Sequence, residues 1–148
     1  FALSDTLMHP RMGEMMWFMR VNAWHHSMAI ARGPHPSLHH ASFEMRGLDE
    51  YMRGTGRVMR AGIKKIWGPG RHNAGNNTFS YFLDPSGNTM EYTTELEKIE
   101  TDPWHPSVYD IADPMTQDVW GTSDPMSEII ARDSFNDPDK GVFVAPPV

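Results

Sequence analysis

The stretch from Leu38 to Leu96 decides the fold of this 148-residue chain. It opens with the alternating run LHHASFEM (38–45), continues through LDEYMRGTGRVMRAG (48–62), and ends in TFSYFL (78–83) and TMEYTTEL (89–96). Short alternating runs bounded by Gly, Pro, Asn and Asp predict strands. Residues 48–60 instead repeat their apolar side chains at the three-and-four spacing of an amphipathic helix. The expected order from Leu38 onward is therefore β-α-β-β-β.

Charges and turn residues support the ends of these elements. The acidic pair at 49–50 lies in the first helical turn and Arg60 in the last, which matches the helix dipole, and Gly62 is a C-cap candidate. The stretches between the longer runs complete the prediction. They are a short strand at 64–67, a loop at 68–76 and a tight turn at 84–88.

The segments on either side of this stretch have a different texture. Residues 15–21 and 25–31 predict a hairpin, and residues 1–7 read as a strand or its approach. Because a native chain normally begins with Met and a free terminus is usually polar, we expect a piece of a longer polypeptide. Seven of the twelve prolines lie in residues 101–148, which predicts an extended tail with one short helix near residues 126–133.

Composition excludes several classes of function. The chain has 39% hydrophobic residues and 22% charged residues, which fit a soluble globular protein of one domain. Its predicted strands and helix make the expected fold class α+β. A net charge of -6, with no basic cluster larger than Lys64-Lys65, argues against a nucleic-acid partner. No apolar run approaches the ~20 residues of a membrane span. Without a basic-then-apolar leader, a cytoplasmic location is the default expectation.

Two residues could form part of a metal site. His40 lies on the first strand of the β-α-β-β-β unit and Glu91 on the last, so a curled sheet could direct both into one concavity. With no cysteine in the chain, any metal must sit on nitrogen and oxygen ligands, which suits Fe(II) or Mn(II). The alternative is a strand-edge histidine and a solvent-facing carboxylate.

Three more residues are candidates for handling protons or binding a ligand. His26 belongs to a His-His pair in which one member is expected to face inward and the other outward. His72 lies in a Gly/Asn-rich loop, a typical position for a residue that reaches into a binding site. Tyr81 lies on a predicted strand. Taken alone, each has a simpler interpretation as a strand histidine, an exposed loop histidine or a core aromatic.

Together these residues resemble a known family. The motifs occur in order across about residues 1–100 as HHSMAIA (25–31), LHHASFE (38–44), WGPGRH (67–72), FSYFLDPSGN (79–88) and MEY (90–92). They resemble the type I extradiol ring-cleavage dioxygenases of the vicinal oxygen chelate superfamily, such as catechol 2,3-dioxygenase and 2,3-dihydroxybiphenyl 1,2-dioxygenase. The resemblance implies βαβββ modules, one truncated (1–33) and one complete (38–100), ahead of a Pro/Asp-rich C-terminal tail (101–148).

The resemblance also implies an activity in the degradation of aromatic compounds. Such enzymes bind Fe(II), in some members Mn(II), and insert both atoms of O2 into a catechol beside its two hydroxyls. His40 matches the second histidine ligand of the family and Glu91 its carboxylate ligand. His26 matches the acid/base histidine of the pocket, while His72 and Tyr81 match residues that hydrogen-bond the bound catecholate.

One part of the family pattern is missing. The first histidine ligand of the family lies ahead of the position matched by Phe1, and His9, His35 and His105 are at the wrong places to substitute for it. We therefore expect this chain alone to bind metal weakly and to turn over slowly or not at all. Two alternatives remain, a glyoxalase-like metalloenzyme and a non-catalytic small-molecule binder of the same superfamily. A truncated module would leave an unpaired sheet edge, which could pair with a second copy of the chain, so we also expect a homo-oligomer.

Overall fold

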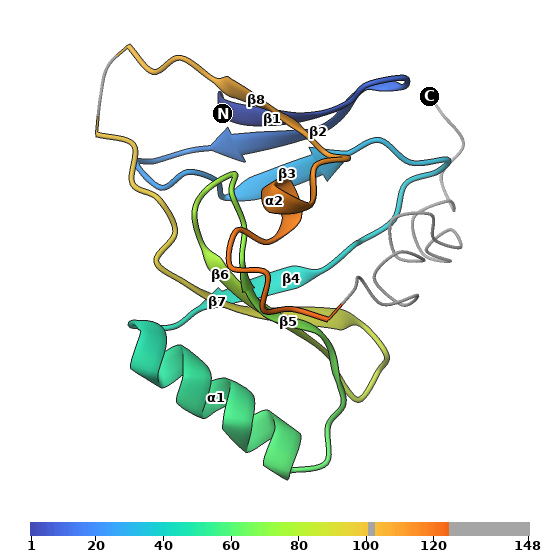
Figure 1. The fold of residues 1–148 in the computed structure, drawn as a ribbon, viewed down its shortest axis with the longest axis vertical. Helices are drawn as coiled ribbons and strands as arrows, with labels where there is room; N and C mark the ends of the chain where they lie inside the picture. Colours follow the sequence, from blue (N-terminus) through green and yellow to red (C-terminus); the bar gives the residue numbers. More distant parts are fainter. Residues whose placement is uncertain (101–102, 125–148) are drawn as a thin grey trace, which may run out of the picture.

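The computed structural model describes residues 1–100 and 103–124, which form two four-stranded sheets (Figure 1). This α+β architecture confirms the predicted fold class. The first sheet has the order β3-β2-β1-β8, from β1 (Ala2–His9), β2 (Gly13–Arg20), β3 (Met28–Ala31) and β8 (Ser107–Asp110). The second has the order β4-β7-β6-β5, from β4 (Ala41–Glu44), β5 (Lys65–Arg71), β6 (Thr78–Leu83) and β7 (Thr89–Thr94). The helices are α1 (Leu48–Arg60) and α2 (Pro114–Gln117).

The second sheet has the predicted β-α-β-β-β order. Its first and last strands, β4 and β7, pair in parallel, with Ser42 opposite Glu91. Parallel pairing needs a long crossover, which here consists of α1, β5 and β6. On the other side of β7, β6 pairs in antiparallel register, with Tyr81 opposite Glu91. Glu91 therefore lies on an inner strand of this sheet, flanked by β4 and by Tyr81.

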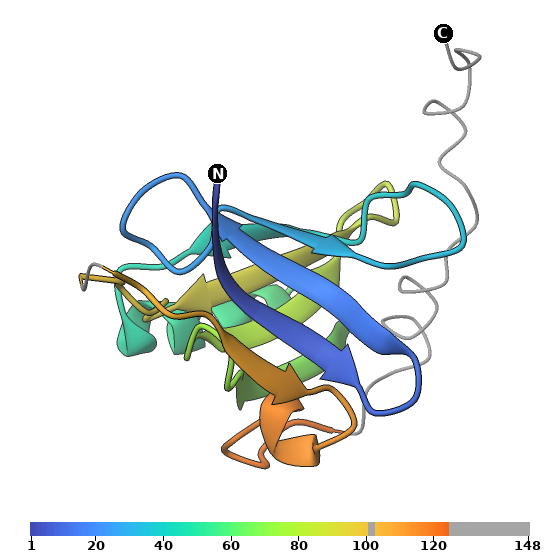
Figure 2. The same cartoon turned by 90° about the horizontal axis from the view of Figure 1, so that it is seen from above.

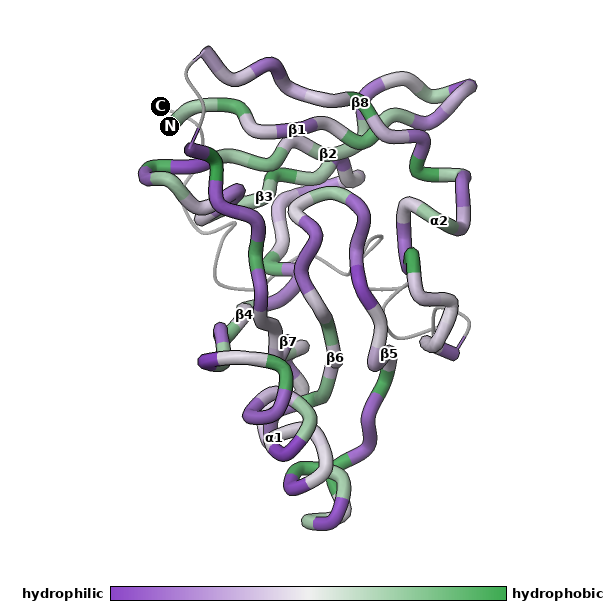
Figure 3. The backbone as a smooth tube through the Cα atoms, turned by 60° about the vertical axis from the view of Figure 1, so that its left-hand side comes forward, coloured by the Kyte–Doolittle hydropathy of each residue, from purple (hydrophilic) through white to green (hydrophobic). Residues whose placement is uncertain are grey.

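Helix α1 covers the face of the second sheet that points away from the first sheet (Figures 1 and 2). Apolar and polar residues alternate along it with the helical period (Figure 3). Its Tyr51 is fully buried and donates a hydrogen bond to the carbonyl oxygen of Phe79 at 2.6 Å. Gly54 packs against the ring of Tyr92, since a Cβ at Gly54 would lie 3.4 Å from that ring, in van der Waals contact. These contacts set the distance between α1 and strands β6 and β7.

Strand β5 runs further than the sequence predicted. The expected strand ended at Trp67 with a loop from residue 68, but the structure continues β5 to Arg71 with register shifts against β6. The loop prediction for 68–71 was wrong because the glycines here serve close approach rather than a turn. A Cβ at Gly68 or at Gly70 would lie 2.5 Å from an atom of Phe79. Bulged strands accept glycine and proline at such positions.

The first sheet contains the predicted hairpin, with β2 and β3 antiparallel and Phe18 opposite Ala29. Two strand starts were predicted too early, because β3 begins at Met28 and β4 at Ala41. Both His-His pairs therefore precede their strands instead of lying on them. The first residue of each of these strands is set by where backbone pairing with the neighbouring strand begins, and the alternation of side chains along the sequence does not reveal that.

Part of the C-terminal tail joins the first sheet. Strand β8 pairs in parallel with β1, with Asp5 opposite Ser107 (Figure 1). The short helix predicted near residues 126–133 lies outside the described residues. Among the residues that the structure does describe, no helix is long and apolar enough to cross a membrane.

Replacing Gly70 tests the close approach of β5 to β6. In Gly70→Ala the new methyl would meet the ring of Phe79 at 2.5 Å and the carboxyl of Asp118 at 2.8 Å, so we expect a loss of about 1–3 kcal/mol in the free energy of unfolding. Urea denaturation followed by tryptophan fluorescence measures it. The control is Gly56→Ala inside α1, where the added methyl meets only the end of the flexible Arg60 side chain. Equal losses in both variants would contradict the packing argument.

Candidate functional site

The two predicted metal ligands lie side by side. The Nε2 atom of His40 is 3.3 Å from Oε2 of Glu91, whose side chain is only 5% exposed. On the other side of its ring, His40 shares a 2.6 Å hydrogen bond between its Nδ1 and that of His39. In the metal-free chain His40 Nε2–H donates to the carboxylate, and a metal bound at Nε2 would replace that proton. The bond with His39 then holds the ring by its second nitrogen, the usual arrangement of a metal-binding histidine.

Glu91 is a buried carboxylate with one uncommitted oxygen. Burial favours its neutral form, but the hydrogen bond with His40 and the charges of His40 and His72 hold its pKa below the usual value. It is therefore ionised at neutral pH. Within the described part of the chain, its Oε1 is buried and has no hydrogen-bond partner. An uncompensated buried carboxylate oxygen is costly, and a cation would satisfy it.

His72 is held in one tautomer by the C-terminal segment. Its Nδ1–H donates to the carbonyl oxygen of Gln117 in α2 at 2.8 Å, which leaves Nε2 as an acceptor 3.2 Å from the hydroxyl of Tyr81. The ring stacks on Phe79, with centroids 4.1 Å apart and planes 15° apart. Burial lowers the pKa of His72, so the ring is neutral at neutral pH. The sequence indicated His72, but its partner in α2 came only from the tertiary structure.

Tyr81 lies between the histidines and the carboxylate. It is opposite Glu91 in the sheet, and its ring meets that of His40 edge-on with centroids 5.2 Å apart. Burial, and then the negative charge of Glu91, raises its pKa well above the usual value. The phenol is therefore protonated at neutral pH and acts as a hydrogen-bond donor.

His26 reaches this group from the first sheet. Its ring packs against Phe18 of β2, with centroids 5.0 Å apart. Burial, and then the electrostatic effect of the adjoining His25 ring, lowers the pKa of His26 to about 4. The charges of Glu91, His72 and His40 also act on it, so His26 is near all three. The fold thus brings all five candidate residues together.

Two residues that support His26, namely His25 and Asp5, were not predicted from the sequence. His25 is fully buried, with Nε2 2.8 Å from Oδ2 of Asp5 and Nδ1 2.8 Å from Nδ1 of His26. The expectation that one histidine of the pair faces outward was wrong, because residues 25–26 lie outside β3 and do not alternate. The available signal was a charged residue, Asp5, inside an otherwise apolar and small-residue run.

The donor set fits Fe(II) or Mn(II), which accept imidazole nitrogen and carboxylate oxygen. The orphaned Oε1 of Glu91 beside His40 is the structural observation behind this fit. No group of three or more His, Cys, Asp or Glu residues that could hold a metal occurs within residues 1–100 and 103–124. His9 instead accepts two backbone N–H groups of its own turn, from Arg11 and Met12.

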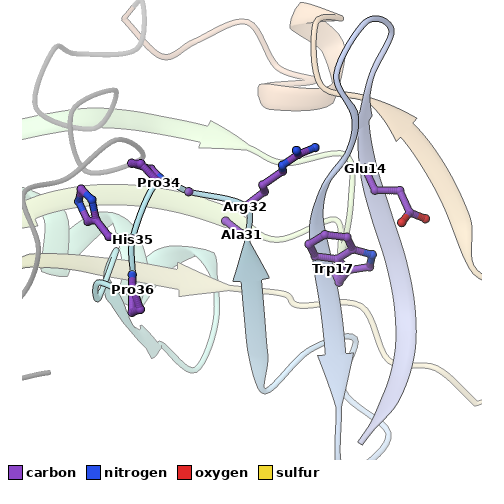
Figure 4. Close-up of a pocket in the computed structure, with 8 residues that line it drawn as sticks. Glu14, Trp17, Ala31, Arg32, Pro34, His35 and Pro36 are labelled. Atoms are coloured by element: carbon purple, nitrogen blue, oxygen red, sulfur yellow. The ribbon is translucent and has the colours of Figure 1, made fainter. Parts of the chain in front are cut away.

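A separate hollow of about 670 Å³ lies beside β2 and the segment after β3 (Figure 4). Trp17, Arg32 and His35 contribute to its lining. None of the five candidate residues lines it. The candidate site is therefore the His40–Glu91 group.

The lowered pKa of His26 predicts a pH dependence of stability. Because the pKa falls from 6.5 to about 4 on folding, the unfolded chain binds more protons between these values. In the metal-free chain this contribution is complete above pH 6.5 and is lost as the pH falls toward 4, by about 3 kcal/mol. Urea denaturation across this range measures it. His26→Gln should flatten the slope and His9→Gln should not, and an unchanged slope in His26→Gln would refute the assignment.

The chain is similar to proteins named as a metapyrocatechase, a glyoxalase and a homoprotocatechuate 2,3-dioxygenase. No family model matches the chain. Metapyrocatechase 2 of Cupriavidus necator is 35% identical over 75 residues, covering 51% of this chain and 23% of that protein. The crystal structure of the Mn(II)-bound glyoxalase from Novosphingobium aromaticivorans is 40% identical with a TM-score of 0.79, over 94% of this chain and 42% of that one.

A third relative shows the fold alone. Homoprotocatechuate 2,3-dioxygenase from Brevibacterium fuscum, in its complex with 3,4-dihydroxyphenylacetate, has a TM-score of 0.77 at 21% identity, over 88% of this chain and 41% of that one. The chain spans less than half the length of each of these proteins. The resemblance of this chain to the type I extradiol dioxygenases of the vicinal oxygen chelate superfamily is thus confirmed in sequence and in fold.

Proposed function

We propose that this chain forms part of an extradiol dioxygenase that opens a catechol-type ring with O2. The observation that carries the proposal is the buried, unpartnered Oε1 of Glu91 beside His40, on a face shared with Tyr81. A metal site needs such a carboxylate, and catechol chemistry needs proton-handling groups around it. The similarity to metapyrocatechase 2 supports the same activity.

In this proposal His40 and Glu91 hold the metal through Nε2 and a carboxylate oxygen. Bound Fe(II) or Mn(II) lowers the pKa of a catechol hydroxyl and leaves open positions where substrate and O2 meet. We infer that a further protein ligand, a histidine in the family, comes from outside the described residues. The earlier expectations of a homo-oligomer and of a cytoplasmic location stay predictions.

The surrounding residues bind the substrate and move its protons. Tyr81, protonated at neutral pH, donates a hydrogen bond to a substrate oxygen. His72, fixed by Gln117, offers its Nε2 as an acceptor to the same region. His26 is neutral at pH 7 and can take the proton that a catechol hydroxyl loses.

A glyoxalase-like metalloenzyme is the second candidate. The observation that favours it is the 40% identity with the Mn(II)-bound glyoxalase from Novosphingobium aromaticivorans. Such chemistry uses the same fold and a metal but does not consume oxygen. The gathering of His26, His72 and Tyr81 around the carboxylate favours ring cleavage, because the oxygen-free chemistry does not need that group. The same side chains, with His40 and Glu91, speak against a non-catalytic binder.

Substitution of Glu91 tests the metal site. Glu91→Gln removes the charge but keeps the shape, so we expect the affinity for Mn(II) to fall by at least about tenfold. Electron paramagnetic resonance of free Mn(II) during titration of the 148-residue chain measures the affinity. Glu44→Gln, an exposed carboxylate on neighbouring β4, is the matched control. Equal Mn(II) binding by wild type and Glu91→Gln would refute ligation by Glu91.

Oxygen consumption tests the activity. With Fe(II) and a catechol, we expect oxygen uptake together with a yellow ring-opened product, from this chain or from any longer protein that its gene encodes. His26→Gln should lower kcat by about 10²–10⁴-fold, since it removes a proton-transfer group. The control is His9→Gln, in an exposed turn. Metal-dependent conversion of a 2-oxoaldehyde without oxygen uptake would favour the glyoxalase-like candidate instead.

A further inference from the structure

A chain of three buried or half-buried groups leads away from the candidate site. Asp5 of β1 is 1% exposed and His25 is fully buried. Oδ2 of Asp5 lies 2.8 Å from Nε2 of His25, and Nδ1 of His25 lies 2.8 Å from Nδ1 of His26. Both ring nitrogens of His25 are therefore hydrogen-bonded, so that Asp5, His25 and His26 form one continuous hydrogen-bonded chain.

The orientation of Asp5 fixes the first link of this hydrogen-bonded chain. Its Oδ1 accepts the backbone N–H of Ser107 in β8 at 2.7 Å, so only Oδ2 is left to face the histidine. An ionised carboxylate accepts and cannot donate. The proton of that link therefore sits on Nε2 of His25. In a neutral imidazole the other nitrogen, Nδ1, is then an acceptor.

The second link follows from the first. Because His25 Nδ1 accepts, His26 Nδ1 must carry the proton between the two rings. A neutral His26 is then unprotonated at Nε2, the nitrogen on the side of the ring away from His25. The charges of Glu91, His72 and His40 all act on His26, so the candidate site lies within reach of this ring.

We propose that Asp5 and His25 are positioning residues that hold His26 in the tautomer whose bare Nε2 can accept a proton from the substrate. When Nε2 takes a proton, the proton on His26 Nδ1 passes to His25 Nδ1. The positive charge then rests on His25, beside the carboxylate of Asp5, and His26 stays neutral. Return of the proton reverses both steps, so no atom or charge is gained or lost. This inference rests on the proposed role of His26.

The packing around His25 prevents its ring from turning. Its backbone N–H donates to the carbonyl oxygen of Glu97 at 2.9 Å. Gly75 lies so close that a Cβ there would be 2.9 Å from His25 Nδ1, and Phe18 covers the ring with centroids 5.4 Å apart. Loop 72–77 and segment 97–99 of the second module thus hold a residue of the first in place.

Asp5→Asn tests the proposal because the geometry dictates how the amide must lie. Its oxygen keeps the N–H of Ser107, so its NH2 group faces Nε2 of His25 and donates. His25 must then carry its proton on Nδ1 and donate to His26, which moves the proton of His26 to Nε2. We expect both tautomers to invert, an outcome that a purely structural role for Asp5 would not produce.

Ring nitrogen shifts from ¹⁵N-labelled histidine in the metal-free 148-residue chain report the tautomers, since a bare ring nitrogen resonates far downfield of a protonated one. In wild type at neutral pH we expect bare Nδ1 in His25 and bare Nε2 in His26. A protonated Nε2 in His26 of the wild type would overturn the proposal, even if Asp5→Asn did not fold. Unchanged tautomers in folded Asp5→Asn would overturn it too.

The matched control is Asp110→Asn, an exposed carboxylate of β8 that accepts a backbone N–H from Ala112. It should leave every histidine tautomer unchanged. Because the shifts are measured without substrate or oxygen, they test the relay independently of ring cleavage. Absent oxygen uptake with the expected tautomers would reject the proposed function alone, and ring cleavage with the opposite tautomers would reject the relay alone.

Discussion

The parallel pairing of β4 with β7 is the constraint on which the candidate site depends. It sets Ser42 opposite Glu91 and brings His40, just ahead of β4, within 3.3 Å of the carboxylate. The antiparallel pairing of β7 with β6 then sets Tyr81 opposite the same residue. A slip of one residue in either register would turn Glu91 or Tyr81 to the other face of the sheet. The helix and the bulged β5 keep these registers in place.

Burial gives each polar side chain of the group a defined role. It keeps Tyr81 protonated and the two histidines His26 and His72 neutral, while hydrogen bonding keeps Glu91 ionised. One negative oxygen thus lies among neutral donors and acceptors in a low-dielectric setting, where electrostatic interactions are strong. Such an arrangement suits a cation and a substrate that must lose a proton.

Backbone contacts join the segment ahead of β3 to the segment that follows β7. Trp24 forms an isolated antiparallel bridge with Lys98, and Ile99 donates to the carbonyl oxygen of Ala23 at 2.7 Å. These contacts draw the segment ahead of β3 alongside the end of the second module. His26 consequently lies within electrostatic range of Glu91, although no strand pairing joins the two residues.

Local sequence patterns determined the elements. The amphipathic spacing of residues 48–60, the Asp84–Asn88 turn signal and the alternating runs around Tyr81 and Glu91 depend on neighbours a few residues apart, and each was predicted within about two residues. The motifs also indicated His26, His40, His72, Tyr81 and Glu91 as a set, through resemblance rather than through spacing.

Tertiary structure alone decided what surrounds these residues. The buried Asp5–His25 pair joins residues 20 positions apart, and His72 depends on Gln117, 45 positions away. Residues 68–71 were predicted as a loop. In the structure they belong to β5, where Gly68 and Gly70 allow close approach to the backbone and the ring of Phe79. Such contacts depend on which backbones come together, and the local period of a sequence carries no record of that. The sequence by itself therefore determined most of the strands, helix α1 and the candidate residues. Long-range pairing decided the extent of β5, the pairing of β8 and how the charges and protons of the site are held.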